Sequence, residues 1–171
     1  MILNSRRIIM GIIYGIILLV VVFLLAAQFG LLSGKQPHNI GVTSERLKPP
    51  SKTRNSVSSQ ANLHTDLMDT ALVQYASIEP LPFKNNNAAN SMQVLLLVLK
   101  TMPGVMIVDA KPNYIYAQST TKVLKFVDDV EFWVNPAKGV IDVRSASRLG
   151  REDFGVNRQR IEAIRAAYTA N

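Results

Sequence analysis

The sequence predicts a small α+β domain that follows one membrane-spanning helix, and three observations lead to this prediction. Residues 8–27 carry no charge and are nearly all large and apolar. Residues 87–102 place apolar side chains at helical spacing, and four strand-like segments follow between residues 105 and 147. Because helices flank a run of consecutive strands, we expect a two-layer domain in which an antiparallel meander packs against helices.

The N-terminal segment divides into a short basic tail at residues 1–7 and a predicted transmembrane anchor at residues 8–32. About twenty apolar residues in a helix span the hydrocarbon core of a bilayer. A cleaved signal peptide is the alternative, but its apolar region has only about 7–15 residues. The best cleavage site, after Ala27, also places Leu25 where a small residue is typical. The sequence therefore favours an uncleaved, single-pass anchor.

Gly11 and Gly15 form a G-x-x-x-G pattern inside this anchor. Such a pattern allows two transmembrane helices to pack closely. It is also frequent by chance in apolar segments, so a homodimer through these glycines is possible but not favoured.

The charges that flank the anchor predict the side of the membrane on which the domain lies. Arg6 and Arg7 favour a cytoplasmic N-terminus, whereas Lys35 and Arg46 act in the opposite sense. Because a tail of seven residues is easily retained in the cytoplasm, we expect the domain on the extracytoplasmic side of the cell membrane, which is the periplasm in a bacterium.

Residues 33–54 are predicted to be a basic, flexible tether, because they contain prolines and many polar side chains but almost no large apolar ones. Of the formal charge of +7, residues 35–62 hold five basic and one acidic side chain, a net +4. Residues 63–171 hold twelve basic and eleven acidic side chains, a net +1. A nucleic-acid-binding domain is expected to carry its charge on the fold. The distribution therefore argues against nucleic acid and favours lipid head groups as the partner of the tether.

Residues 55–171 are predicted to form the α+β domain. Residues 55–59 are expected to dock on it, residues 63–75 have the spacing of a short helix, and residues 78–83 contain two prolines and predict an extended edge strand. The clearest helix, at residues 87–102, stops before Gly104.

Strands are expected at residues 105–109 and 114–118, and the last helix begins near Asp153 or Asn157. This helix has an apolar face, and Arg158 and Glu162 are expected to form an exposed i,i+4 pair. Its apolar face comprises Ile161, Ile164 and Tyr168.

The most distinct strand pair flanks the four-residue loop at residues 136–139, which has Pro at its start and Gly at its end. If Asn135 pairs with Val140, the register places Phe132 opposite Val143 and Glu131 opposite Arg144. A slip of one residue would place Phe132 opposite Asp142, so the hydrophobic pattern selects the first register.

Asp128 is an anomaly in this register, because it lies with Ser145 and Ser147 at one end of the apolar face. A carboxylate that enters a core must be paired or hydrogen-bonded. Its expected partners are the downstream arginines Arg148, Arg151, Arg158 and Arg160. Two interpretations stay open: Asp128 fixes the following loop to the sheet, or it lines a polar pocket.

The loop at residues 145–158 invites a similar choice. Its two glycines and three arginines precede a helix N-terminus, where backbone N–H groups favour anions. The alternative is a capped loop held by Arg–Asp pairs. The candidate ligand-binding residues are Asp128, Arg144, Arg148, Arg151, Asp153, Asn157 and Arg158.

The sequence lacks the residues that several kinds of catalytic and metal-binding chemistry need. The chain has no cysteine, its two histidines are His38 and His64, and it has neither a G-x-S-x-G elbow nor a Walker-type loop. Asp128 and Asp129 are neighbours in a strand and point to opposite faces, so they do not form a metal cluster with Glu131. No metal or cofactor is expected.

Several of these segments carry a family resemblance. They are Phe126–Phe132, Val143–Arg148 with Gly150, Asp153–Arg158, Asn55–Ser59 and Met102–Val105. Over about residues 54–168 the chain resembles the family called domain of unknown function fourteen ninety-nine, which has bacterial and plastid members. The family often has Cys where Ser56 stands, so the resemblance implies no cysteine-based role here. It implies no activity.

The sequence thus favours a non-enzymatic binding module for a cell-envelope partner or an anionic ligand near the bilayer. The alternative is a membrane-tethered hydrolase in which Asp128 acts as general base in a polar pocket.

Overall fold

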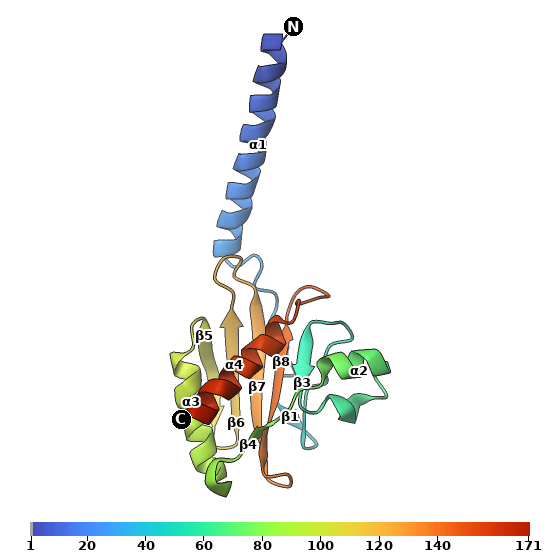
Figure 1. The fold of residues 1–171 in the computed structure, drawn as a ribbon, viewed down its shortest axis with the longest axis vertical. Coiled ribbons are helices and arrows are strands. Elements are labelled where there is room, and N and C mark those ends of the chain that lie inside the picture. The colour runs from blue at the N-terminus through green and yellow to red at the C-terminus, as the bar shows by residue number, and fades with distance from the viewer. Residues whose placement is uncertain (1) are drawn as a thin grey trace.

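The computed structural model describes residues 2–171, with side chains described from Ser5 onward. Figure 1 shows helix α1 (Ile2–Gln28) extending away from one end of a domain that holds all the remaining elements. Within the described residues, one helix is long and apolar enough to cross a membrane, at Ser5–Gln28. A signal sequence near the N-terminus can meet the same criteria of length and hydropathy as a membrane anchor.

The domain is built on a six-stranded antiparallel sheet with helices α3 and α4 packed on one face (Figure 1). The strand order is β3-β8-β7-β6-β5, and β4 pairs separately with β8. The strands are β3 (Ser56–Ser58), β4 (Leu81–Pro82), β5 (Val105–Lys111), β6 (Tyr114–Thr120), β7 (Val127–Asn135) and β8 (Val140–Ser147). The predicted α+β class and the meander of the last four strands are confirmed.

The β7–β8 hairpin has the register that the sequence predicts. Asn135 pairs with Val140, Phe132 with Val143, and Glu131 with Arg144. The apolar side chains of this face form the main core with those of α3 (Ala88–Thr101) and α4 (Val156–Ala170). From α4 the core takes Ile161, Ile164 and Tyr168, as predicted.

The helix ends follow local chemistry. The Asn87 side chain caps α3 by accepting a hydrogen bond from the backbone N–H of Asn90 at 2.9 Å. After α3, Gly104 has φ +74°, and a Cβ built there would lie 2.7 Å from the Thr120 carbonyl oxygen. Only glycine fits this turn without strain, so it fixes where β5 begins.

The segment before the sheet differs in part from the prediction. A short 3₁₀ helix, η1 (Ala61–His64), precedes α2 (Thr70–Ala76), where one helix over residues 63–75 was expected. A second 3₁₀ helix, η2 (Lys84–Asn86), leads into α3. Residues 55–59 do dock on the domain, since β3 pairs with β8.

The expected pair between Arg158 and Glu162 is wrong. Arg158 donates hydrogen bonds to the carbonyl oxygens of Tyr75 at 2.6 Å and Ser77 at 2.7 Å. Glu162 instead pairs with Arg165 at 2.9 Å. Arg158 therefore holds the end of α2 against α4.

The second face of the sheet is covered by residues 40–50, which we call the strap. It contains a hairpin of two short strands, β1 (Val42–Thr43) and β2 (Arg46–Leu47). Leu47 is 1% exposed and packs in a second apolar cluster with aromatic side chains of the sheet. Those side chains are Tyr114, Tyr116 and Trp133.

The strap differs from the free, flexible tether that the sequence predicts for residues 33–54. The backbone N–H of Leu47 donates to Gln60 Oε1 at 2.7 Å, and that of Gly41 donates to Glu131 Oε1 at 2.8 Å. A few apolar side chains and two anchored backbone groups are enough to order this segment, because the sheet offers them a complementary aromatic surface.

Candidate functional site

Strand β7 carries three acidic side chains, and an arginine pairs with each of them. All six side chains are buried or nearly so, and the pairs lie on both faces of the sheet. They are Asp128–Arg160, Asp129–Arg148 at 2.7 Å and Glu131–Arg144 at 2.9 Å. A buried carboxylate without such a partner is strongly destabilising, so the pairs are part of the architecture of the domain.

The pairs of Glu131 and Asp129 lie on the second face. Glu131 also accepts hydrogen bonds from the Tyr114 hydroxyl at 2.9 Å and from the strap. Burial, together with the Glu131 carboxylate, raises the pKa of Tyr114. The sequence predicts that Glu131 lies opposite Arg144, and the structure shows that the two side chains form an ion pair that is buried on the face covered by the strap.

Arg148 makes the corresponding contact with Asp129. Its Nε and Nη2 atoms both donate to the carboxylate, at distances of 2.7–3.2 Å, and the Tyr116 hydroxyl donates to Asp129 at 2.6 Å. This fork-like contact leaves Arg148 committed to the sheet. Arg144 and Arg148 therefore lie on the face opposite Asp128.

Asp142 on β8 is a buried carboxylate that the sequence did not single out. It has no cationic partner in the described chain, and amide and hydroxyl groups satisfy it instead. It accepts hydrogen bonds from Ser59 at 2.7 Å, from Gln60 at 2.8 Å and from Asn135 at 2.8 Å. These bonds link the start of η1 to the β7–β8 hairpin.

On the helix-covered face, Asp128 belongs to a network centred on Asn157. Arg160, which pairs with Asp128, also donates to Ser145 at 2.9 Å and to Asn157 Oδ1 at 2.8 Å. Asn157 Nδ2 donates to Asp153 Oδ2 at 2.7 Å. Of the seven candidate residues, the structure brings Asp128, Asp153 and Asn157 together.

The N-terminus of α4 is occupied by the Asp153 carboxylate. This carboxylate accepts from the backbone N–H groups of Gly155 at 3.0 Å and Asn157 at 2.9 Å, and from the Tyr75 hydroxyl. Burial alone would raise the pKa of Asp153, but these hydrogen bonds outweigh it and the net pKa is lowered. Burial and the Asp153 contact raise the pKa of Tyr75 to about 12. The capped-loop interpretation of this helix end therefore matches the geometry.

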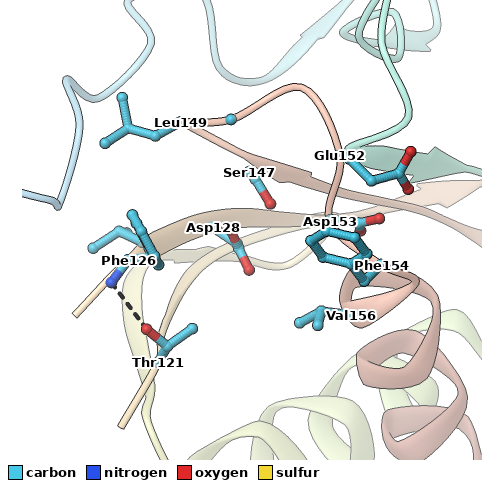
Figure 2. A pocket seen from close by; sticks show the side chains of 11 residues that line it. Thr121, Phe126, Asp128, Ser147, Leu149, Glu152, Asp153, Phe154 and Val156 are labelled. Carbon is cyan, nitrogen blue, oxygen red and sulfur yellow. Dashed lines mark hydrogen bonds between the residues drawn. The ribbon is translucent and has the colours of Figure 1, made fainter. Parts of the chain in front are cut away.

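A cavity of about 360 Å³ opens beside this network (Figure 2). Figure 2 shows the Asp128 side chain between Phe126 and Val156, with Phe154 and Leu149 farther along the wall. The wall is mainly apolar. Its acidic side chains are Asp128, Glu152 and Asp153, and its hydroxyl groups are those of Thr121 and Ser147. Asp128 thus lines a cavity, but the wall is mainly apolar and none of the candidate arginines lines it, so the cavity differs from the polar pocket considered for Asp128.

The cavity lies at the end of the domain from which α1 extends. Gln28 Nε2, at the end of α1, donates to the Val123 carbonyl oxygen at 2.8 Å. A Cβ at Gly34 would lie 2.7 Å from the Cβ of Arg148 and 3.1 Å from Leu149. The chain that leaves α1 therefore contacts both loops that border the cavity.

The same end of the domain exposes large apolar side chains. Phe154 is 85% exposed, although it lies beside the cavity and has a positive φ of 52°. Val123, Leu149, Val156, Phe29 and Leu31 are also exposed. Sequence reasoning missed this patch, because its members come from three separate segments.

Three basic side chains complete this end of the domain. Lys122 and Lys125 lie on the loop that carries Thr121 and Phe126, and Arg151 lies on the opposite loop. None of the three forms an ion pair within residues 5–171. The wall itself contains three carboxylates: Asp128 and Glu152 are ion-paired, and Asp153 is held by hydrogen bonds. Within the same residues, no group of three His, Asp or Glu side chains is arranged to hold a metal ion.

These features define an α+β domain with an apolar cavity beside the end of a single hydrophobic helix. Residues 46–168 match the model of a family described as "Protein of unknown function (DUF1499)", and the chain belongs to this family. The match begins inside the strap. No curated protein and no solved structure matches the chain.

Proposed function

We propose that this chain is a single-pass membrane protein of the cell envelope whose domain binds an amphipathic lipid with an anionic head group. The observation that carries the proposal is the apolar cavity beside the end of α1, and the two loops that line it also carry Lys122, Lys125 and Arg151. In this proposal the anionic ligand is itself a lipid of the bilayer.

The length of the apolar helix supports the position of the cavity. Ser5–Gln28 contains 24 residues, which is about 36 Å of helix and slightly more than the ~30 Å hydrocarbon core. When this helix spans the bilayer, Gln28 lies at the level of the head groups. The loop of Val123, to which Gln28 donates a hydrogen bond, then lies at the same level.

The chemistry of the cavity supports an amphipathic ligand. An apolar chain in the cavity contributes ~0.8 kcal/mol for each methylene that leaves water. Lys122, Lys125 and Arg151 each contribute ~1 kcal/mol if they face anionic head groups. Exposed Phe154 is an apolar side chain of the kind that enters the boundary between head groups and acyl chains.

The hydrolase hypothesis has weaker support. Asp128 lines the cavity, as a general base would, but its carboxylate is the ion-pair partner of Arg160. Asp128→Asn separates the two functions: a folded variant that still binds lipid but loses a lipid-hydrolysing activity would favour the hydrolase.

Val156→Glu is expected to abolish lipid retention, because it places a carboxylate at the mouth of the apolar cavity. A glutamate at the first turn of α4 is compatible with the helix, so the domain should still fold. The full chain, purified in a mild detergent, is compared with the variant by native mass spectrometry of co-purified lipid. We expect at least a tenfold loss of bound anionic lipid.

Leu97→Glu is the matched control, since Leu97 is an exposed apolar side chain on α3 outside the cavity. It should retain lipid as the native chain does. Equal lipid retention by Val156→Glu and the native chain would contradict the proposal.

The proposed orientation places the domain on the extracytoplasmic side of the cell membrane. Reporters that are active on only one side of the membrane, fused after Asn171, should give a signal from the outside alone. The intact mass of the purified chain should include residues 1–27. A cytoplasmic reporter signal would contradict the orientation, and a mass that begins after Ala27 would identify a cleaved signal peptide.

A further inference from the structure

A second cavity, of about 260 Å³, lies between the strap and η1. Its wall contains basic, amide and hydroxyl groups and no carboxylate. The lining residues are Asn39, Gly41, Thr43, Arg46, Leu47, Lys48, Pro49 and His64.

His64 is the unusual member of this wall. The residue is 6% exposed, and its Nε2 is buried without a hydrogen-bond partner within residues 5–171. Burial, then the charge of Arg46, lowers the pKa of His64; Asp66 acts in the opposite sense and Arg144 adds to the lowering. The imidazole is therefore neutral near pH 7. A buried polar atom without a partner costs stability, so its retention here calls for an explanation.

Two cations of the wall also lack acidic partners. Arg46 donates through Nη1 to the Leu63 carbonyl oxygen at 3.2 Å, and Lys48 donates to Asn39 Oδ1 at 2.5 Å. Neither forms an ion pair within the described part of the chain. The remaining N–H groups of both side chains are available to a ligand in the cavity.

The two carboxylates that act on Lys48 are already neutralised by arginines, whereas Asp66, which acts on His64, forms no ion pair within residues 5–171. Burial and then Arg144 lower the pKa of Lys48, while Glu131 and Asp129 act in the opposite sense. Those two carboxylates pair with Arg144 and Arg148. The cavity thus presents two positive charges, a neutral imidazole and an amide, with no competing acid in its wall.

We propose that this cavity binds a phosphate group, as inorganic phosphate or as a soluble phosphomonoester. The two charges of Arg46 and Lys48 match the charge of a phosphomonoester, about −1.5 to −2 at pH 7. Arg46 offers the planar donor geometry that suits phosphate, and Lys48 adds a point charge. His64 completes the set as a donor whose pKa rises when the anion arrives.

This phosphate site is independent of the lipid cavity. Strand β1, which belongs to the strap, lies toward the end of the domain away from α1 (Figure 1). The wall of the proposed phosphate site shares no residue with the wall of the cavity that contains Asp128. Failure of either proposal therefore leaves the other standing.

The test uses the full chain in nanodiscs of zwitterionic lipid, with inorganic phosphate as the probe and the imidazole resonances as the readout. The chain has two histidines, and His38→Gln identifies the signals of His64. Saturating phosphate should shift the His64 signals and raise its pKa, and phosphate should bind at least tenfold more tightly than acetate.

Arg46→Gln and Lys48→Gln should each weaken phosphate binding at least tenfold. Lys52→Gln removes an exposed charge of the same chain segment that does not line the cavity, and it is the matched control, with an expected change of less than twofold. Absence of saturable phosphate binding, or binding that Arg46→Gln leaves unchanged, would overturn the proposal.

A further arm separates a soluble phosphate from a lipid phosphate. The same chain in nanodiscs that contain phosphatidic acid, without free phosphate, should leave the His64 signals unchanged. A shift of these signals in that arm would identify a lipid head group as the ligand and would overturn the assignment to a soluble phosphate.

Discussion

Arg144→Met is expected to lower the free energy of unfolding by about 3–5 kcal/mol, which is the usual cost of breaking a buried ion pair. Glu131 is completely buried and Arg144 is 4% exposed, so loss of the guanidinium leaves a charge that water cannot reach. Denaturant unfolding of the full chain in detergent measures this effect. The single, buried Trp133 lies on the same face of the sheet and reports the transition by fluorescence.

Lys111→Met provides the control for this prediction. Lys111 pairs with Asp109 at 2.8 Å, but both side chains are well exposed, so the expected loss is below about 1 kcal/mol. A double variant that combines Arg144→Met with Glu131→Gln removes both charges of the buried pair. It should recover part of the stability that Arg144→Met loses. An Arg144→Met variant within 1 kcal/mol of the native chain would mean that Glu131 reaches water, and that the strap does not seal this face.

The hairpin register was predictable because one face of β7 and β8 is apolar. With side chains alternating between faces, only one pairing places Phe132 opposite Val143. The same reasoning showed that Asp128 needed a cation, and Arg160 was among the four arginines considered. The sequence thus predicts that a buried carboxylate has a cationic partner, even when several cations could be that partner.

The arrangement of the candidate site was less predictable, although the alternation of side chains along β8 predicts where two of its arginines lie. Residues 144, 146 and 148 lie on one face of β8 and its continuation, so Arg144 and Arg148 had to lie opposite Asp128. This alternation separates Arg144 and Arg148 from Asp128, so the seven candidate residues do not form one site. Arg151 is the one candidate arginine that stays exposed and without an ion pair within residues 5–171.

The cavity beside α1 and the cavity of His64 could not be found from local patterns. The first is lined by residues 121–128 and 147–156, two segments that meet at one end of the sheet. The second depends on the strap, where Ile40, Val42 and Leu47 are spread among polar residues and show no clear strand or helix period. Sequence patterns report the periodicity of one element, whereas these cavities arise where separate segments meet.

Leu47→Ala is expected to lower the free energy of unfolding by about 2–5 kcal/mol, because it opens a cavity beneath the strap. Leu47, a residue of the strap, is 1% exposed and packs against the aromatic side chains of Tyr114 and Trp133. A freely moving tether over residues 33–54 would instead make this substitution neutral. Leu97→Ala, at an exposed position on α3, controls for the loss of leucine methyl groups and should change stability little.

The result for Leu47→Ala also bears on how the domain sits relative to the bilayer. If the strap is docked, the free connection after α1 is short, and Gly34 holds the chain against Arg148 and Leu149. The lipid cavity then stays at the membrane surface. Faster amide hydrogen exchange at Gly41 and Leu47 in the variant would show that the strap has opened. A neutral Leu47→Ala variant would return residues 33–54 to a tether, and the hydrogen bond from Gln28 to Val123 would then be the remaining reason for placing the cavity of Asp128 beside the head groups.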